Sequence, residues 1–192
     1  NELSRSYALR GVQLILPMLE KIIEGGCESL SEEDREQLYN GSIYGGMAIN
    51  VTGTVINIVN KYKSKWFIIG NGSNIILPDY YDGVIIKLNG FNKCIVSNNE
   101  VYVESGCMIN KIANDLASNG YAGLDFACGI PGTIGGSIYG NAGCYGNSIG
   151  DTLISATLFD GRNIIEMSNE DLKFSYRYSI LKEKNNLVIG CK

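Results

Sequence analysis

Two glycine-bearing segments contain the residues of this sequence that are best suited to bind a ligand. The first is Gly70-Asn71-Gly72-Ser73-Asn74, which follows the apolar run 65–69. Two glycines one residue apart let the backbone turn sharply and direct successive N–H groups toward one point, and such a nest of amides binds phosphate without a charged side chain. Because the third glycine of the dinucleotide fingerprint is missing, a plain turn remains an alternative interpretation.

The second segment is much richer in glycine. Its centre, residues 130–137, reads Ile-Pro-Gly-Thr-Ile-Gly-Gly-Ser, and residues 141–146 follow as Asn-Ala-Gly-Cys-Tyr-Gly. Ordering so much glycine costs conformational entropy, which a folded protein tolerates where backbone must approach a flat or anionic ligand closely. We therefore predict a ligand-lined surface here, the alternative being a crowded β-corner packed on itself. The ten glycines of the segment are Gly120, Gly123, Gly129, Gly132, Gly135, Gly136, Gly140, Gly143, Gly146 and Gly150.

Composition excludes several classes of site. The 192 residues are 45% hydrophobic and 19% charged, with a net charge of −4 and no basic cluster, which argues against a nucleic-acid partner. Histidine is absent, so a histidine general base, a histidine metal ligand and a covalent bond between histidine and a flavin are all excluded. The six cysteines form no C-x-x-C pair, and no metal site is predicted. The apolar run 12–19 is too short to span a membrane. A chain of this size does not need disulfides, so reduced, buried thiols in a cytoplasmic protein are expected.

Residues 1–40 are predicted to form a helical extension. Apolar residues recur there at three- and four-residue spacing and end before Gly25-Gly26. Ser31 with Asp34 is a plausible start for a second short helix, which Gly41 would close. The apolar positions of the first helix are Leu9, Val12, Leu16, Leu19 and Ile23.

After residue 41 the pattern favours a mixed α+β fold without strict βαβ alternation. Short strands are predicted at 66–69, 84–88, 94–96, 101–104 and 186–191, and a hairpin at 152–167 turns through Asp160-Gly161. A helical stripe of Ile109, Ile112, Ala113, Leu116 and Ala117 ends at Gly120. Ser168 and Asp171 could cap one further turn of helix, and residues 51–62 fit either a helix or a strand.

Three motifs together resemble the UDP-N-acetylenolpyruvoylglucosamine reductase (MurB) family. Residues 123–136, GLDFACGIPGTIGG, continue to NAGCYG at 141–146 and are similar to the family's GLEFASGIPGTVGG…NAGAYG segment, which wraps a flavin. The loop Gly70–Asn74 is similar to its GGGSN pyrophosphate loop. Residues 174–179, FSYRYS, match its F-x-Y-R-x-S motif. The motifs occur in the family's order, and the resemblance covers residues 40–192.

The resemblance implies a PCMH-type FAD-binding fold of two α+β subdomains. They would span residues 41–104 and 105–192, after the helical extension at 1–40. The family's third, substrate-binding domain is absent from this chain, since the sequence ends at Lys192. The chain would then be either a fragment of a longer reductase or a shortened relative. The family's protonating serine and its glutamate lie in that domain, so neither residue is assigned.

The resemblance also implies an activity. The family reduces UDP-N-acetylglucosamine enolpyruvate in peptidoglycan synthesis, with NADPH as hydride donor and non-covalently bound FAD as the carrier. Arg177 corresponds to the arginine that stabilises the enolate, a role that suits a permanently charged bidentate donor. Tyr145 and Tyr176 would line the substrate side. The implied cofactor-binding residues are Gly70, Asn71, Gly72, Ser73, Asn74, Cys128, Gly129, Ile130, Gly132, Thr133, Gly135, Gly136, Asn141, Ala142, Gly143 and Gly146.

Departures from the family pattern leave alternatives open. Residues 44–48 are only faintly similar to the family's T-F-x-I-G-G-P-A segment, and Gly140 replaces a larger apolar residue. Cys128 or Cys144 could bond a flavin covalently, as cysteines do in related PCMH-type oxidases, although a small thiol in place of Ser or Ala is the simpler interpretation. The alternative functions are a non-catalytic flavin- or nucleotide-binding module and a PCMH-type FAD oxidase. The oligomeric state stays open.

Overall fold

The computed structural model describes residues 21, 31–33, 65–160 and 163–192. The predicted first helix, residues 44–48 and the ambiguous segment 51–62 lie outside the described residues, apart from Lys21, which is helical. Ser31 directly precedes a helical pair, Glu32 and Glu33, as the predicted second helix requires. The chain forms two compact units, Asn1–Phe67 with Tyr80–Ile86, and Ile68–Asp79 with Lys87–Lys192.

Strands β1 (Trp66–Ile69) and β2 (Val84–Lys87) form a two-stranded sheet. Near its start, the N–H of Val84 donates to the carbonyl of Lys65 at 2.9 Å. The rings of Phe67 and Tyr81 pack in a tilted arrangement with their centroids 6.4 Å apart. Both strands lie where the β-branched and aromatic runs predict them.

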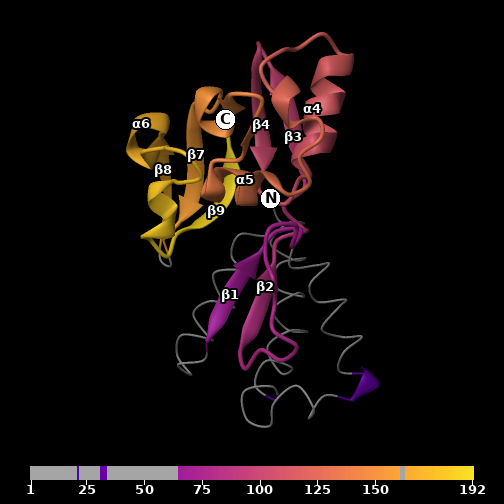
Figure 1. Ribbon diagram of the computed structural model, residues 1–192, viewed down its shortest axis with the longest axis vertical. Helices are drawn as coiled ribbons and strands as arrows, with labels where there is room; N and C mark the ends of the chain where they lie inside the picture. Colours follow the sequence, from indigo (N-terminus) through magenta and orange to yellow (C-terminus); the bar gives the residue numbers. More distant parts are fainter. Residues whose placement is uncertain (1–20, 22–30, 34–64, 161–162) are drawn as a thin grey trace, which may run out of the picture. The chain divides into compact units, whose positions relative to one another are not determined.

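A five-stranded antiparallel sheet is the scaffold of the second unit, in the order β3-β4-β9-β7-β8 (Figure 1). Its strands agree with the predicted positions to within three residues at either end. The last predicted strand, β9, therefore occupies the centre of the sheet, and all five of its residues are buried. The strands are β3 (Cys94–Ser97), β4 (Glu100–Glu104), β7 (Ser155–Phe159), β8 (Ile164–Ser168) and β9 (Leu187–Cys191).

Helices α4 (Ile109–Ser118) and α5 (Ile134–Gly140) contribute to the core on one face of this sheet. Four of the five positions in the predicted stripe of α4 are buried, and Ala117 is exposed. Gly120 follows the helix with φ +82°, the left-handed conformation that a helix-terminating glycine supplies. Figure 1 shows α5 against β9 and β4.

The remaining elements are short. Helix α6 (Asn169–Leu172) packs on β8 and begins with the predicted cap, where the Ser168 hydroxyl accepts from the N–H of Asp171. Strands β5 (Gly143–Cys144) and β6 (Asn147–Ser148) form a small hairpin. Single 3₁₀ turns are η2 (Asp125–Ala127), η3 (Ile149–Asp151) and η4 (Ile180–Lys182).

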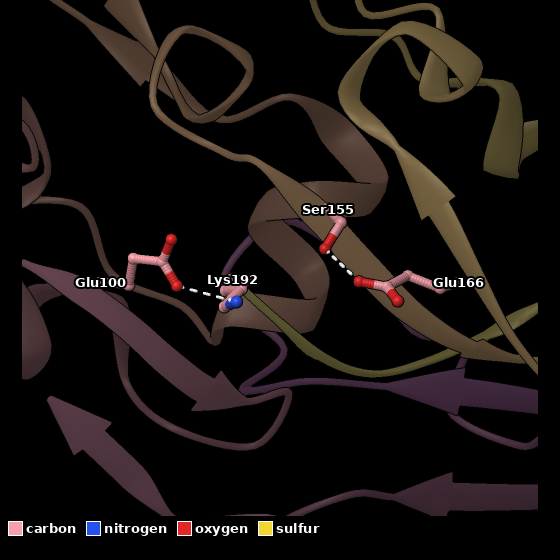
Figure 2. A network of polar contacts seen from close by, with 4 residues as sticks. All are labelled: Glu100, Ser155, Glu166 and Lys192. Carbon is pink, nitrogen blue, oxygen red and sulfur yellow. Dashed lines mark hydrogen bonds and ion pairs between the residues drawn. The ribbon is translucent and has the colours of Figure 1, made fainter. Parts of the chain in front are cut away.

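Polar contacts tie the strands together at one end of the sheet (Figure 2). The Lys192 ammonium pairs with the Glu100 carboxylate at 2.7 Å, and the Ser155 hydroxyl donates to Glu166 at 2.6 Å. The hydrogen bond to Glu100 raises the pKa of Lys192, and the Glu166 charge adds to the shift. Because both partners of the ion pair are about half exposed, water screens it and it adds little stability.

The compact units do not follow the predicted boundary between residues 104 and 105. Val103 pairs with Cys191, and Glu104 with Gly190, so the strand Glu100–Glu104 belongs to the same sheet as the end of the chain. Pairing between strands nearly ninety residues apart has no local signal in the sequence, and the division of the chain at residue 104 stays a prediction.

Two buried thiols, Cys191 in β9 and Cys107 shortly after β4, predict a loss of stability at alkaline pH. Burial, with smaller contributions from neighbouring groups that include the Cys94 thiol, raises the pKa of Cys107 from 9.0 to about 11 and that of Cys191 from 9.0 to about 12. The unfolded chain therefore releases these protons first. The thiol contribution to the free energy of unfolding is complete below about pH 9 and is lost as the pH rises toward the folded-state values. The urea concentration at the midpoint of unfolding should fall as the pH rises across this range. In the double variant Cys107→Ala/Cys191→Ala it should fall less steeply. An equally steep fall in the double variant would contradict the role of the two thiols.

Candidate functional site

The two glycine-bearing segments meet in the second compact unit. The Ser73 hydroxyl donates to the carbonyl of Pro131 at 2.8 Å. A Cβ at Gly70 would collide with the Thr133 hydroxyl, and a Cβ at Gly132, whose φ is +144°, would lie 3.3 Å from Ser73 Oγ. Glycine is therefore needed at both positions for the loops to approach each other.

Helix α5 emerges directly from the second of these loops. The Thr133 hydroxyl caps it by accepting from the N–H of Gly136 at 3.3 Å. Ile134 and Ile138, one turn apart, are fully buried. A Cβ at Gly135 would lie 2.9 Å from Ser105 Cβ, so this glycine lets the helix approach β4 closely. The glycines of the segment thus serve packing as well as an open surface.

Backbone N–H groups without an acceptor among the described residues occur in both loops, on the exposed residues Ser73 and Gly129 and on the buried Gly132. Gly129 is exposed, and a Cβ there would meet nothing within 4 Å. Unpaired amides beside an open glycine surface are the features that a diphosphate and a flat ring require, so the residues present fit a flavin dinucleotide.

The predicted residues beyond α5 form a second group at the other end of the helix. Asn141 ends α5 in the left-handed conformation, and its side chain is committed to the protein. Its Nδ2 donates to the carbonyl of Ser175 at 2.9 Å, while its Oδ1 accepts from the N–H of Gly150 at 3.0 Å. The seven residues of α5 separate the two groups by about 10 Å.

A cleft of about 770 Å³ opens at this second end, between residues 141–151 and 169–177. The predicted residues Gly143, Gly146, Tyr145, Tyr176 and Arg177 all line it. Tyr145 is 92% exposed and Tyr176 is 91% exposed, so both phenol rings are free to contact a ligand. Lys173 adds a second cation to the lining, and the sequence analysis did not identify it.

Arg177 presents an exposed guanidinium at the edge of this cleft. Its Nη2 donates a long hydrogen bond to the carbonyl of Gly143 at 3.4 Å, and the guanidinium carbon lies 5.9 Å from the centre of the Tyr176 ring. Within the described part of the chain no carboxylate pairs with it. An exposed, unpaired guanidinium stacked on an aromatic ring is well suited to bind a carboxylate or an enolate.

Backbone strain is concentrated around the cleft. Six described residues other than glycine have positive φ, and Asn98 and Asn99 form the turn between β3 and β4. The other four all line the cleft: Asn141, Tyr145, Lys173 and Arg177. A left-handed conformation costs a non-glycine residue about 1–2 kcal/mol. Asn141 and Lys173 adopt it as the C-caps of α5 and α6, whereas Tyr145 and Arg177 adopt it in turns that line the cleft.

Cys128 and Cys144 are half-buried free thiols, and Cys94, Cys107 and Cys191 are also unpaired. Cys128 and Ile130 pack against the hydrophobic core, whereas Ala142 donates its N–H to the Ser137 carbonyl. Among the described residues there is no cluster of acidic, cysteine or histidine side chains that could hold a metal ion. None of the described helices has the length and apolarity to cross a bilayer.

A family model described as FAD binding domain matches residues 52–166, which is more than half of the sequence. The chain belongs to the FAD-binding domain family. The UDP-N-acetylenolpyruvoylglucosamine reductase of Bacillus pumilus (strain SAFR-032) is 39% identical over 145 residues, which are 73% of this chain and 48% of the relative. The reductase of the same name from Caldanaerobacter subterraneus subsp. tengcongensis is 34% identical over 187 residues, 92% of this chain and 61% of the relative. The chain thus spans about half the length of such relatives.

Solved structures agree. The crystal structure of the MurB reductase from Thermus caldophilus superposes with a TM-score of 0.58 at 25% identity, covering 70% of this chain and 50% of that one. The oxidoreductase GilR, of gilvocarcin biosynthesis, superposes with a TM-score of 0.56 at 11% identity over 75% of this chain and 33% of that one, and shares the fold alone. The predicted resemblance to the FAD-binding portion of the MurB family and the predicted α+β, PCMH-type fold are confirmed.

Proposed function

We propose that this chain is the flavin-binding part of a UDP-N-acetylmuramate dehydrogenase that acts in peptidoglycan synthesis in the cytoplasm. The enzyme would use NADPH to reduce the enolpyruvyl ether of UDP-N-acetylglucosamine. The observation that carries the proposal is that α5 joins two sites: two glycine loops with unpaired amides at its start, and a cleft with an exposed Arg177 at its end. The reductase names of the relatives support the same substrate.

The loop Gly70–Asn74 and residues 128–136 would hold the cofactor through backbone N–H groups and through Ser73. Cys128 would act as a small residue of this surface, which keeps the cofactor non-covalent. Bound FAD would carry a hydride from NADPH to the enolpyruvyl double bond. The protein must then stabilise the negative charge that develops next to the substrate carboxylate, which is the task of a fixed cation.

Arg177 is the residue that we assign to this task. Its two-pronged guanidinium can bind a carboxylate and an enolate oxygen together, whereas a lysine offers only a point charge. Tyr145 and Tyr176, on the same cleft, would pack against the sugar or the ether group. The lining also holds the carboxylates of Asp151 and Glu170. These would repel an anionic substrate group and so direct it toward Arg177 and Lys173.

Flavin titration of the purified protein tests the proposal and separates it from the two alternatives. We expect saturable binding of one FAD per chain, measured by quenching of flavin fluorescence. In the full-length protein we expect NADPH oxidation only when the enolpyruvyl substrate is present. Oxygen-dependent oxidation of an alcohol would favour a PCMH-type oxidase. Saturable FAD binding by the full-length protein without either reaction would favour a non-catalytic module, and absence of FAD binding would reject both the reductase and the oxidase.

A further inference from the structure

The turn that carries Arg177 is closed on itself and strained. The backbone N–H groups of Ser175 and Tyr178 each donate to the carbonyl of the other at 3.1 Å. Arg177 lies inside this turn with φ +54°. A short turn with a left-handed arginine at its tip keeps its shape only if neighbouring groups hold it, because the conformation is unfavourable for a residue other than glycine.

Lys182 supplies one such contact. Its ammonium donates to the backbone carbonyl of Arg177 at 2.8 Å and lies 6.0 Å from the centre of the Tyr139 ring. The bond goes to the main chain, so it fixes the backbone of Arg177 without competing for the guanidinium. A hydrogen bond from a charged donor is stronger than a neutral one, and it is well suited to hold a strained carbonyl.

Two further bonds join this turn to the end of α5. Asn141 donates to the carbonyl of Ser175, and the fully buried Ser179 hydroxyl donates to the carbonyl of Tyr139 at 2.7 Å. Lys182, at the end of η4, therefore acts on a turn that is already attached to α5 on both sides. Tyr139, which packs beneath the ammonium, is itself a residue of α5.

We propose that Lys182 is a positioning residue that holds the backbone of Arg177, and so aims its guanidinium into the cleft; its effect on turnover rests on the function proposed above. Lys182 does not act as a ligand of the substrate. Among the described residues that line the cleft are Lys173 and Arg177, but not Lys182. Its ammonium reaches the turn from outside the cleft.

Hydrogen exchange measures the positioning role without any turnover. The variant Lys182→Met keeps the length of the side chain but removes the donor, and the N–H groups of Ser175 and Tyr178 should exchange about 10-fold faster or more. Lys182→Arg should restore slow exchange, and Lys184→Met, at an exposed lysine two residues along the chain, should leave it unchanged. Unchanged exchange in Lys182→Met would overturn the proposal.

A double-mutant cycle then tests whether Lys182 acts through Arg177. In the full-length protein loaded with FAD, Lys182→Met should lower kcat about 10- to 100-fold with flavin affinity retained, and Lys182→Arg should recover most of it. In an Arg177→Ala background the same change should have almost no effect. An equal loss in both backgrounds would overturn the proposal. If the unaltered protein reduces no enolpyruvyl substrate, the proposed function fails, while the exchange rates still decide the role of Lys182.

Discussion

Replacing Arg177 by alanine is expected to lower kcat about 100- to 1,000-fold while FAD affinity changes less than about twofold. The expectation follows from position, because Arg177 lies at the cleft at the end of α5 and not at the glycine loops at its start. Its guanidinium has no carboxylate partner among the described residues, so the substitution breaks no ion pair and should leave the free energy of unfolding nearly unchanged. Steady-state kinetics and a flavin titration measure the two effects separately.

The conservative variant sharpens this test. Arg177→Lys retains the charge but loses the bidentate geometry and the stacking on Tyr176, so it should recover only part of the turnover. Lys184→Met removes a positive charge from an exposed residue that does not line the cleft and should have no effect on kcat. Full activity in Arg177→Ala would contradict a catalytic role, and an equal loss in Lys184→Met would indicate a general effect of net charge.

Local chemistry accounts for the parts of the fold that the sequence predicted well. The stripe of α4 ends at Gly120, the cap at Ser168 closes on Asp171, and the short strands lie between turn residues. Each of these elements depends on residues within a few positions of one another, so their pattern is visible in the chain itself. The turn at residues 70–74, in which Gly72 has φ +75°, is predictable for the same reason, and its binding of phosphate stays a prediction.

Helix α5 was missed because three of its seven residues are glycine. Glycine disfavours a helix by about 1 kcal/mol relative to alanine, so propensity argues for a loop. Two signals did point to a helix: Thr133 is a good N-cap residue, and Ile134 and Ile138 stand four residues apart. Burial of both isoleucines, together with the approach of Gly135 to Ser105, outweighs the propensity.

The contacts that position Arg177 have no local signal at all. Asn141 and Ser175 are 34 residues apart, and Ser179 and Tyr139 are 40 residues apart. The motif identified Asn141 as a cofactor residue, but both polar atoms of its amide bind backbone groups of the protein. A motif thus locates the residues of a site more readily than it separates those that touch a ligand from those that hold others in place.

The largest effect on cofactor binding is expected from a single methyl group at Gly129. A Cβ at this position would meet nothing within 4 Å in the protein, and φ does not require glycine, so Gly129→Ala should leave the free energy of unfolding unchanged. The same methyl would project from an exposed loop residue whose own N–H has no acceptor among the described residues. If FAD lies there, overlap should raise its Kd about 10- to 100-fold.

Gly140→Ala is the matched control, since a Cβ there also meets nothing within 4 Å, but the residue lies at the far end of α5. Alanine suits a helix better than glycine, so this variant should gain up to about 1 kcal/mol of stability with an unchanged Kd for FAD. Isothermal titration and urea denaturation of both variants separate ligand contact from folding. Equal FAD affinity in the two variants would mean that the cofactor does not rest on Gly129, and the unpaired amides of the two loops would then need another ligand.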